Sequence, residues 1–266
     1  MFNSIRSIDF STRKDKSVLL ATLFMAVIPY LMMMFLSSAQ EMEFGSITAS
    51  YYFASQNMAA ITVFFYFAIV VIACRVFGAD FSDKTINYEI LSGHNRSTVF
   101  FSRVVVGVIR GAVIPLILTF IPLCVFAFLN GWGQETERTD VIVRTLLVFF
   151  PLVRICALNI MFAGVSGSAG KGIALGFLTE IVMSIVQSLI EEGLHITINY
   201  AFGIINIMLL LTSQNSREIV VDGKPVSVFE TAVTTDMVLK TVGVSLGFTA
   251  AYLMIAYYIF RKKDRS

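Results

Sequence analysis

The sequence predicts an all-α membrane protein, and two observations carry that prediction. The first is composition: 56% of the 266 residues are hydrophobic and only 14% are charged, with a mean hydropathy of +0.79, unlike an ordinary soluble domain. The second is continuity, because the apolar residues form unbroken runs near the roughly 20 residues that cross a bilayer, whereas a β-barrel needs alternating segments of about 10. Six transmembrane helices are therefore expected, at 17–38, 57–77, 105–129, 141–166, 172–190 and 238–260.

A seventh apolar stretch, Leu194–Thr212, is nearly long enough to span. It contains Asn199, Gly203 and Asn206, which suit a broken helix sheltered by protein. A full span here would also leave one chain end, with its four basic residues, on the outer side of the membrane. We therefore expect this stretch to be re-entrant or interfacial, within an outer region covering 191–237.

That outer region also contains "EIVVDGKPVSV", which runs from Glu218 to Val228. Asp222-Gly223 separates two alternating, β-prone runs, a pattern typical of a tight hairpin. The sequence therefore predicts a small hairpin-like loop before the last span.

The loop charges predict the orientation, because cytoplasmic loops carry an excess of Lys and Arg. With the N-terminus inside, only Arg138, Arg217 and Lys224 fall in outer loops. The inner segments hold 13 basic residues: Arg6, Arg13, Lys14, Lys16, Arg75, Lys84, Arg96, Arg103, Lys171, Arg261, Lys262, Lys263 and Arg265. Both termini are therefore expected in the cytoplasm.

The inner loop between the second and third spans, 78–104, is polar and rich in helix-capping residues. Ser82 or Asp83 can begin a short helix and Gly93 can end it. Ile86, Ile90 and Leu91 are expected on one face of this helix. Because a helix this short is marginal alone, something must hold it, and a docking surface on a cytoplasmic partner is one answer.

This loop resembles that of permease subunits of type 2 ATP-binding-cassette (ABC) exporters, on the motifs "FSDKTINYEILSG" and "HNRSTVFFSR". Asp83, Thr85-Ile86, Arg96 and Arg103 fill the places of the family's acidic, Thr-Ile and basic positions. Lys84 departs from the usual glycine, and Asn95 from the usual serine. The basic amphipathic segment 1–16 is similar to the family's N-terminal elbow helix.

The resemblance implies a single permease domain over 1–266, with a coupling helix that contacts a separate ATPase subunit. The implied coupling residues are Asp83, Lys84, Thr85, Ile86, Asn87, Tyr88, Glu89, Ile90 and Leu91. ATP and Mg would bind the ATPase subunit, with no cofactor and no nucleic acid on this chain. The further implied partners are the lipid bilayer and a second permease, either a copy or a similar chain.

The implied activity is export across a bacterial plasma membrane, with an amphipathic peptide or bacteriocin as the favoured substrate. The alternative class is a polytopic membrane protein that does not transport, such as a sensor or an immunity factor. The sequence predicts no enzyme activity in this chain. Its nearest approach to a P-loop, Gly164–Gly172, has Val165 where the pattern needs glycine and Gly172 where it needs Ser or Thr, and it is expected to be a tight turn of small residues.

Ionisable residues inside spans are costly and tend to face a partner or a cavity. Arg154 and Glu180 are expected at similar depths on neighbouring antiparallel helices. Two roles are open for these residues. They can form a structural contact, which is either an Arg154–Glu180 ion pair or a Glu180–Asn159 hydrogen bond. They can also lie on the translocation pathway.

The outer segment also places carboxylates near an imidazole. Glu191 and Glu192 lie four and three residues before His195, so one helical face can present both groups to a metal. Because two or three ligands do not complete a site, a solvated helix end is the favoured interpretation and no metal site is predicted.

Overall fold

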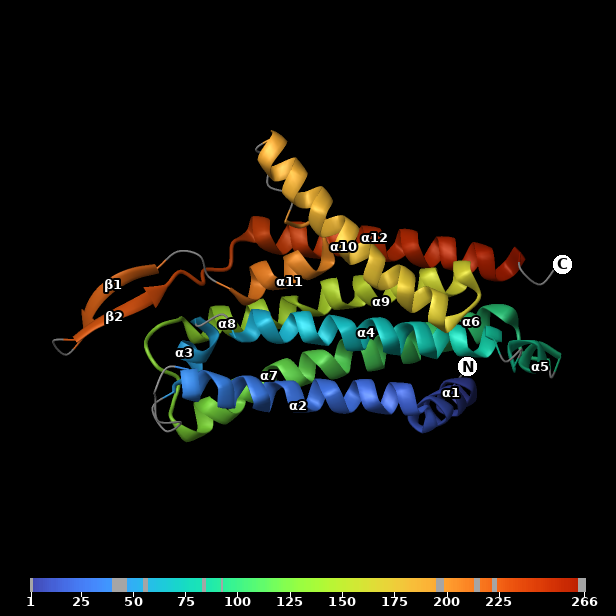
Figure 1. The fold of residues 1–266 in the computed structure, drawn as a ribbon, viewed down its shortest axis with the longest axis horizontal. Helices are drawn as coiled ribbons and strands as arrows, with labels where there is room; N and C mark the ends of the chain where they lie inside the picture. Colours follow the sequence, from blue (N-terminus) through green and yellow to red (C-terminus); the bar gives the residue numbers. More distant parts are fainter. Residues whose placement is uncertain are drawn as a thin grey trace.

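The chain forms an elongated bundle of helices with one small hairpin (Figure 1). The computed structural model describes residues 2–39, 47–54, 57–82, 85–91, 93–194, 199–212, 216–221 and 224–262. The helices are α1 (Phe2–Lys14), α2 (Lys16–Ala39), α3 (Ala49–Ala54), α4 (Asn57–Ser82), α5 (Thr85–Leu91), α6 (Arg96–Val108), the π-helical turn η2 (Ile109–Val113), α7 (Ile114–Leu129), α8 (Arg138–Leu147), α9 (Phe149–Ser166), α10 (Ala169–Leu194), α11 (Gly203–Leu211) and α12 (Thr235–Lys262). The strands are β1 (Ser216–Val221) and β2 (Lys224–Phe229).

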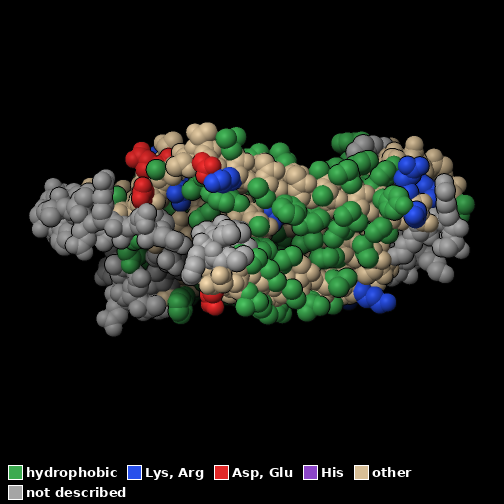
Figure 2. All heavy atoms as spheres, turned by 90° about the horizontal axis from the view of Figure 1, so that it is seen from above, with side chains coloured by type: hydrophobic (Ala, Val, Ile, Leu, Met, Phe, Trp, Pro, Cys, Tyr) green, Lys and Arg blue, Asp and Glu red, His purple; other side chains and the backbone are tan. Residues whose placement is uncertain are grey.

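Five helical segments among the described residues are long and apolar enough to cross a membrane. They are Met58–Ala79, Arg96–Leu129, Arg138–Ser166, Ala169–Gly193 and Thr235–Lys262. A sixth is added if α1 and α2, which meet at a 78° bend, are counted as one broken span. Figure 2 shows hydrophobic side chains over the middle of the molecule, with charged side chains gathered toward its ends. This arrangement fits a multi-pass membrane protein.

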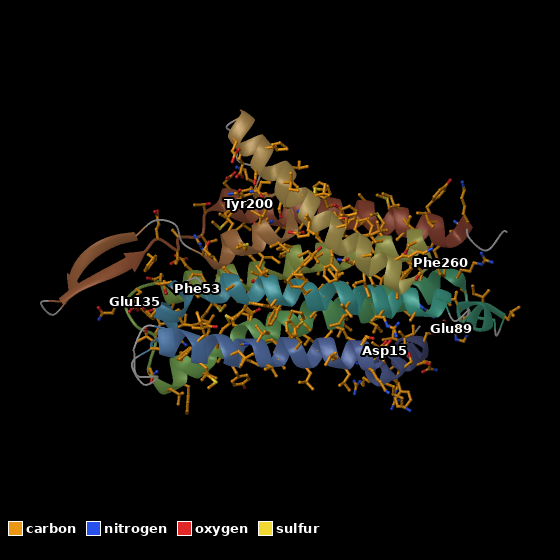
Figure 3. The ribbon with its side chains drawn as sticks, viewed as in Figure 1. Asp15, Phe53, Glu89, Glu135, Tyr200 and Phe260 are labelled. Atoms are coloured by element: carbon orange, nitrogen blue, oxygen red, sulfur yellow. The ribbon has the colours of Figure 1, made fainter. Side chains whose placement is uncertain are left out.

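The bundle has two ends, which we name by what they carry. The terminal end carries α1, α5 and the last turns of α12, and the hairpin end carries α3, the start of α8, and the β1–β2 hairpin (Figure 1). Figure 3 shows Asp15 and Glu89 toward the terminal end and Glu135 and Tyr200 toward the hairpin end. The two ends of the chain therefore approach the same side of the bundle.

Helix α4 occupies the middle of the bundle and packs against α2, α9 and α10. Close approach at the turn between α9 and α10 depends on small residues. A Cβ on Gly78 would lie 2.8 Å from the backbone of Ala169, and one on Gly172 would lie 3.0 Å from the backbone of Ala163. The segment Gly164–Gly172 thus forms a tight helix–turn–helix, as its small residues suggest.

Aromatic rings join three helices at the terminal end. The ring of Phe100 on α6 lies 5.5 Å from that of Phe77 on α4 and 5.6 Å from that of Phe260 on α12, measured between centroids. The hydroxyl groups of Ser97 and Tyr257 are 2.7 Å apart, which adds a polar link between α6 and α12. This cluster holds α6 against α4 and α12. Because α5 directly precedes α6 in the chain, it also limits where α5 can lie.

The third apolar segment, Arg96–Leu129, extends further toward the terminal end than the sequence predicts and is interrupted by η2. Pro115 at the start of α7 lacks the amide that would bond the carbonyl of Gly111, so the helix widens before it. A Cβ on Gly111 would lie 2.7 Å from the sulfur of Cys156. The π-helical turn therefore brings the third segment close to α9.

At the hairpin end, the strands β1 and β2 pair antiparallel, from Ser216 opposite Phe229 to Val221 opposite Lys224. They lie where the sequence predicts a hairpin, although Asp222 and Gly223 themselves fall outside the described residues. The amide of Phe229 donates to the carbonyl of Glu135 at 2.7 Å. The hairpin is therefore tied to the loop between α7 and α8.

Candidate coupling helix and buried arginines

The first candidate site is α5, the short helix of the polar loop. Its carboxyl end is closed by Gly93, whose φ of 93° only glycine adopts easily. The amide of Gly93 donates to the carbonyl of Ile90 at 3.1 Å, and the amide of His94 to that of Glu89 at 3.3 Å. This pair of bonds is the Schellman arrangement, so the sequence "ILSGH" ends the helix in the way it predicts.

Two described side chains, Ile86 and Glu89, hold α5 on the bundle. Ile86 is buried in the core with 3% of its surface exposed. Glu89 forms a two-pronged ion pair with Arg103 on α6, with Oε2 2.9 Å from Nη1 and Oε1 3.1 Å from Nη2. The Arg103 side chain is fully buried, and this carboxylate lies against its charge. A seven-residue helix, which would be marginal alone, thereby gains a fixed position.

The three apolar residues expected on one face of α5 are not equivalent. Ile86 is buried, Ile90 is partly buried, and Leu91 is 81% exposed at the tip of the terminal end. Among the described side chains of α5, Leu91 is therefore the one most open to a partner. Asp83 and Lys84, the first two predicted coupling residues, lie outside the described residues, and Thr85, Asn87 and Tyr88 belong to the α5 backbone.

Three further ion pairs hold α1 and its bend, and none of them is predicted from the sequence. Asp9 on α1 accepts from Arg110 on η2, with Oδ1 2.6 Å from Nη2, and also pairs with Arg13 at 2.8 Å. At the bend, Asp15 accepts from Arg75 on α4, with Oδ2 2.6 Å from Nη2. The only usable signal was Arg110 itself, because an arginine so far inside an apolar run needs a partner.

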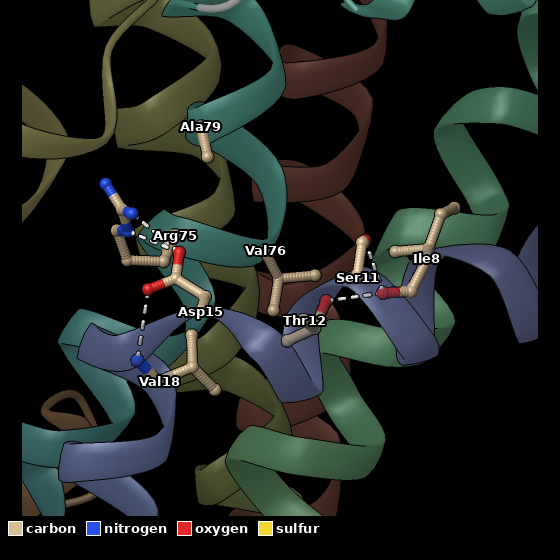
Figure 4. A pocket seen from close by; sticks show the side chains of 8 residues that line it. All are labelled: Ile8, Ser11, Thr12, Asp15, Val18, Arg75, Val76 and Ala79. Carbon is tan, nitrogen blue, oxygen red and sulfur yellow. Dashed lines mark hydrogen bonds and ion pairs between the residues drawn. The ribbon is translucent and has the colours of Figure 1, made fainter.

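The Asp15–Arg75 pair lies in a small cavity of about 170 Å³ where α1, α2 and α4 meet (Figure 4). Asp15 also caps α2, since its Oδ1 accepts from the amide of Ser17 at 2.8 Å. Burial alone raises the pKa of Asp15, but the bonds from Arg75 and Ser17 outweigh it and hold the pKa below the ordinary value of 3.8. In the folded chain, the Asp15 carboxylate is therefore charged at neutral pH.

The pKa of Asp9 is set by the same balance. Burial raises it, while the hydrogen bond and charge of Arg110, followed by those of Arg13, lower it further than burial raises it. Asp9 therefore stays ionised below its ordinary pKa of 3.8. One carboxylate is shared by two guanidinium groups at this corner of the molecule.

The second candidate site is the buried charge in the bundle, and here the structure differs from the expected ion pair. Arg154 donates from Nη1 to the carbonyl of Tyr200 at 3.0 Å and from Nη2 to the carbonyl of Ala201. Its guanidinium lies 4.6 Å from the ring centroid of Phe248 on α12. Glu180 acts on Arg154 only at longer range, and no salt bridge joins these two described residues.

Asn159 also has other partners than Glu180. Its Nδ2 donates to the carbonyl of Ile155 at 2.9 Å, and its Oδ1 faces Gly176 of α10, where a Cβ would lie 2.3 Å away. The expected hydrogen bond from Asn159 to Glu180 is therefore replaced by close helix packing one turn before Glu180. Glu180 itself is half-buried on α10.

A second arginine of the same segment repeats the arrangement of Arg154. Arg144 donates from Nη1 to the carbonyl of Thr212 at 3.0 Å and from Nη2 to that of Ala232 at 3.2 Å. Arg154 thus holds the turn before α11, and Arg144 holds the residue that ends α11. These carbonyls lie beyond the regular helical bonds and need outside donors, so the two arginines fix both ends of α11 inside the bundle.

The group of Glu191, Glu192 and His195, for which the sequence predicts no metal site, is described only in part. Glu191 lies near the end of α10, where its Oε1 accepts from Nε2 of Gln187 at 2.8 Å. His195 lies outside the described residues. Among the residues that the structure describes, no cluster of three or more His, Cys, Asp or Glu side chains is positioned to hold a metal.

Comparison with models of known protein families finds no match to this chain, and comparison with curated proteins finds no significant match either.

Proposed function

We propose that the chain is the permease subunit of an ATP-driven exporter similar to the type 2 ABC exporters, working with a separate ATPase subunit. The observation that carries the proposal is α5: a short, capped helix at the tip of the terminal end, anchored by Ile86 and Glu89, with Leu91 exposed. Two other features support the same proposal: the bent α1–α2 pair at the terminal end and the short apolar helix α11 toward the hairpin end.

In this proposal the terminal end faces the cytoplasm of a bacterial cell, and the chain pairs with a second copy or a similar permease. Closure of the ATPases on ATP and Mg moves α5. Because Glu89 ties α5 to the fully buried Arg103, the movement passes to α6 and, through the Phe100 cluster, to α4 and α12. Substrate then leaves at the hairpin end, with an amphipathic peptide as the favoured class.

Co-purification tests the proposal. The untagged chromosomal ATPase should co-purify with the tagged chain, and Leu91→Asp should abolish its recovery while the permease remains folded. Leu129→Asp is the matched control, because Leu129 is 57% exposed at the hairpin end. If no P-loop protein co-purifies with the wild-type chain from its native membrane, the exporter proposal fails.

The orientation is tested separately by labelling intact cells. A tag placed between Asp222 and Gly223 should be labelled from outside, and a tag after Ser266 should be labelled only after permeabilisation. Labelling of the C-terminal tag in intact cells would reverse the proposed orientation or require that the 194–212 region spans.

The alternative function is a polytopic sensor or immunity factor. The carbonyl bonds of Arg144 and Arg154, which fix the segment between α10 and α12, fit a static scaffold as well as a transporter. A chain that protects cells without any associated ATPase activity would favour this alternative.

A further inference from the structure

A groove of about 370 Å³ opens beside the bend between α1 and α2. Its size falls within the ~300–1,000 Å³ typical of ligand pockets. Eight residues line it: Thr12, Arg13, Val18, Leu19, Thr22, Leu23, Ala26 and Arg110. It is therefore an apolar trough along the first turns of α2 with two arginines at one end.

The arginine end of the groove carries more positive than negative charge. Asp9 is the one carboxylate that Arg13 and Arg110 share, so these three side chains keep a net charge of +1. None of the residues that line the groove is acidic. The side chain of Arg13 is 69% exposed and that of Arg110 is 11% exposed, so Arg13, although paired with Asp9, has room to turn toward an anion while Arg110 is held in place.

The other end of the groove faces the region that the membrane covers. Leu19 and Leu23 are each more than half exposed on α2, one and two turns beyond the bend. An anionic head at the arginines would thus lie at the level of α1, with an apolar chain running along α2 into the bilayer. Positive charge beside an apolar trough is the combination that basic lipid pockets between helices present.

We propose that this groove binds one anionic phospholipid, with its phosphate diester at Arg13 and Arg110 and an acyl chain along Val18, Leu19 and Leu23. The site differs from a general attraction of α1 to a charged surface, because it requires Arg13 and not its neighbours. A bound lipid would brace the α1–α2 bend beside the cavity of the Asp15–Arg75 pair, which shares Thr12 and Val18 with the groove. The proposal does not depend on what the chain transports.

The test measures lipid retained by the full-length chain, purified in detergent and exposed to mixed micelles of phosphatidylglycerol or phosphatidylcholine. Native mass spectrometry then counts the bound lipid. The wild-type chain should retain phosphatidylglycerol in preference to phosphatidylcholine. Arg13→Gln should lower that retention roughly fivefold, the effect of about one basic residue near an anionic lipid surface.

Lys14→Gln is the matched control, because it removes the same charge from the next residue of α1. Lys14 is exposed, lies over the ring of Phe10 at 4.3 Å, and does not line the groove. A specific site predicts that Lys14→Gln retains nearly all of the lipid. Equal losses in the two variants would overturn the proposal in favour of diffuse electrostatic attraction.

Two further arms identify what is bound. Leu23→Gln places a polar group in the trough and should lower retention without changing the charge; unchanged retention would mean that no acyl chain lies there. Glycerophosphoglycerol, the head group without chains, should compete weakly. Full competition by this soluble compound would show an anion site and overturn the lipid assignment.

Discussion

The arginines in the two parts of the bundle have different partners. At the terminal end, Arg75, Arg103 and Arg110 each pair with a carboxylate. In the part of the bundle nearer the hairpin end, Arg144 and Arg154 bind backbone carbonyls instead. Carboxylate pairs join separate elements and respond to pH and salt, whereas carbonyl bonds fix the path of one segment.

The difference matches what each end has to hold. The terminal end must attach α1 and α5, which are short and polar, to the long helices. The other part must hold the turn before α11 and the residue after it, whose backbone carbonyls lie outside the regular helical bonds. A guanidinium group with several donors in a plane can satisfy two such carbonyls at once.

The largest effect is expected at Arg103. Glu89→Gln removes a carboxylate that pairs with its fully buried guanidinium group, which should lower the free energy of unfolding by about 3–5 kcal/mol. The double variant Glu89→Gln with Arg103→Met should recover most of this loss, as thermal unfolding in detergent would show.

The exposed pair Asp236–Lys240 on α12 is the matched control for this experiment, at 2.7 Å with both side chains more than half exposed. Asp236→Asn should leave the thermal unfolding temperature nearly unchanged, because an exposed ion pair contributes little to stability. If the losses of the two single variants at Glu89 and Arg103 simply add, α5 is not anchored as described.

A smaller effect is expected at Arg154. Arg154→Met leaves the carbonyls of Tyr200 and Ala201 without their donor, at a cost of about 1–3 kcal/mol. Hydrogen exchange should rise in the 199–212 segment. Glu180→Gln, on the neighbouring helix, should leave both stability and exchange nearly unchanged.

The outcome also separates carbonyl anchoring from an ion pair. If Glu180→Gln destabilises the chain as much as Arg154→Met and the double variant recovers the loss, the two side chains form a salt bridge. That result would contradict the arrangement of Arg154 described above.

The sequence predicts the helices well because each span is a continuous apolar run, and the capping residues of α5 lie within a few positions of one another. It does not predict the partners of the arginines. Asp9 and Arg110 are 101 residues apart, and nothing local links them. For Arg154 the sequence favours Glu180 because both are ionisable and at similar depth, but its partners are backbone carbonyls, which every residue carries and no pattern reveals.

The smallest effect concerns pH at the α1–α2 bend. Because the pKa values of Asp9 and Asp15 lie below the ordinary 3.8 in the folded chain, their stabilisation is complete above that value. It is lost as the pH falls through the lower folded-state values. Protease access to α1 should therefore rise below a pH of about 4.

The control for the pH experiment is Asp9→Asn with Asp15→Asn. This variant should show raised protease access to α1 at neutral pH and little further change on acidification. A wild-type chain whose α1 is equally accessible at every pH would show that the two carboxylates do not hold the bend.

The most direct test of the proposed coupling role is photo-crosslinking from the tip of α5. A photoreactive amino acid in place of Leu91, in native membranes, should yield a covalent adduct with a P-loop ATPase. The same amino acid in place of Leu129 should yield none. An ATPase adduct from position 129, or none from position 91 while an ATPase co-purifies, would contradict the assignment of α5 as the coupling helix.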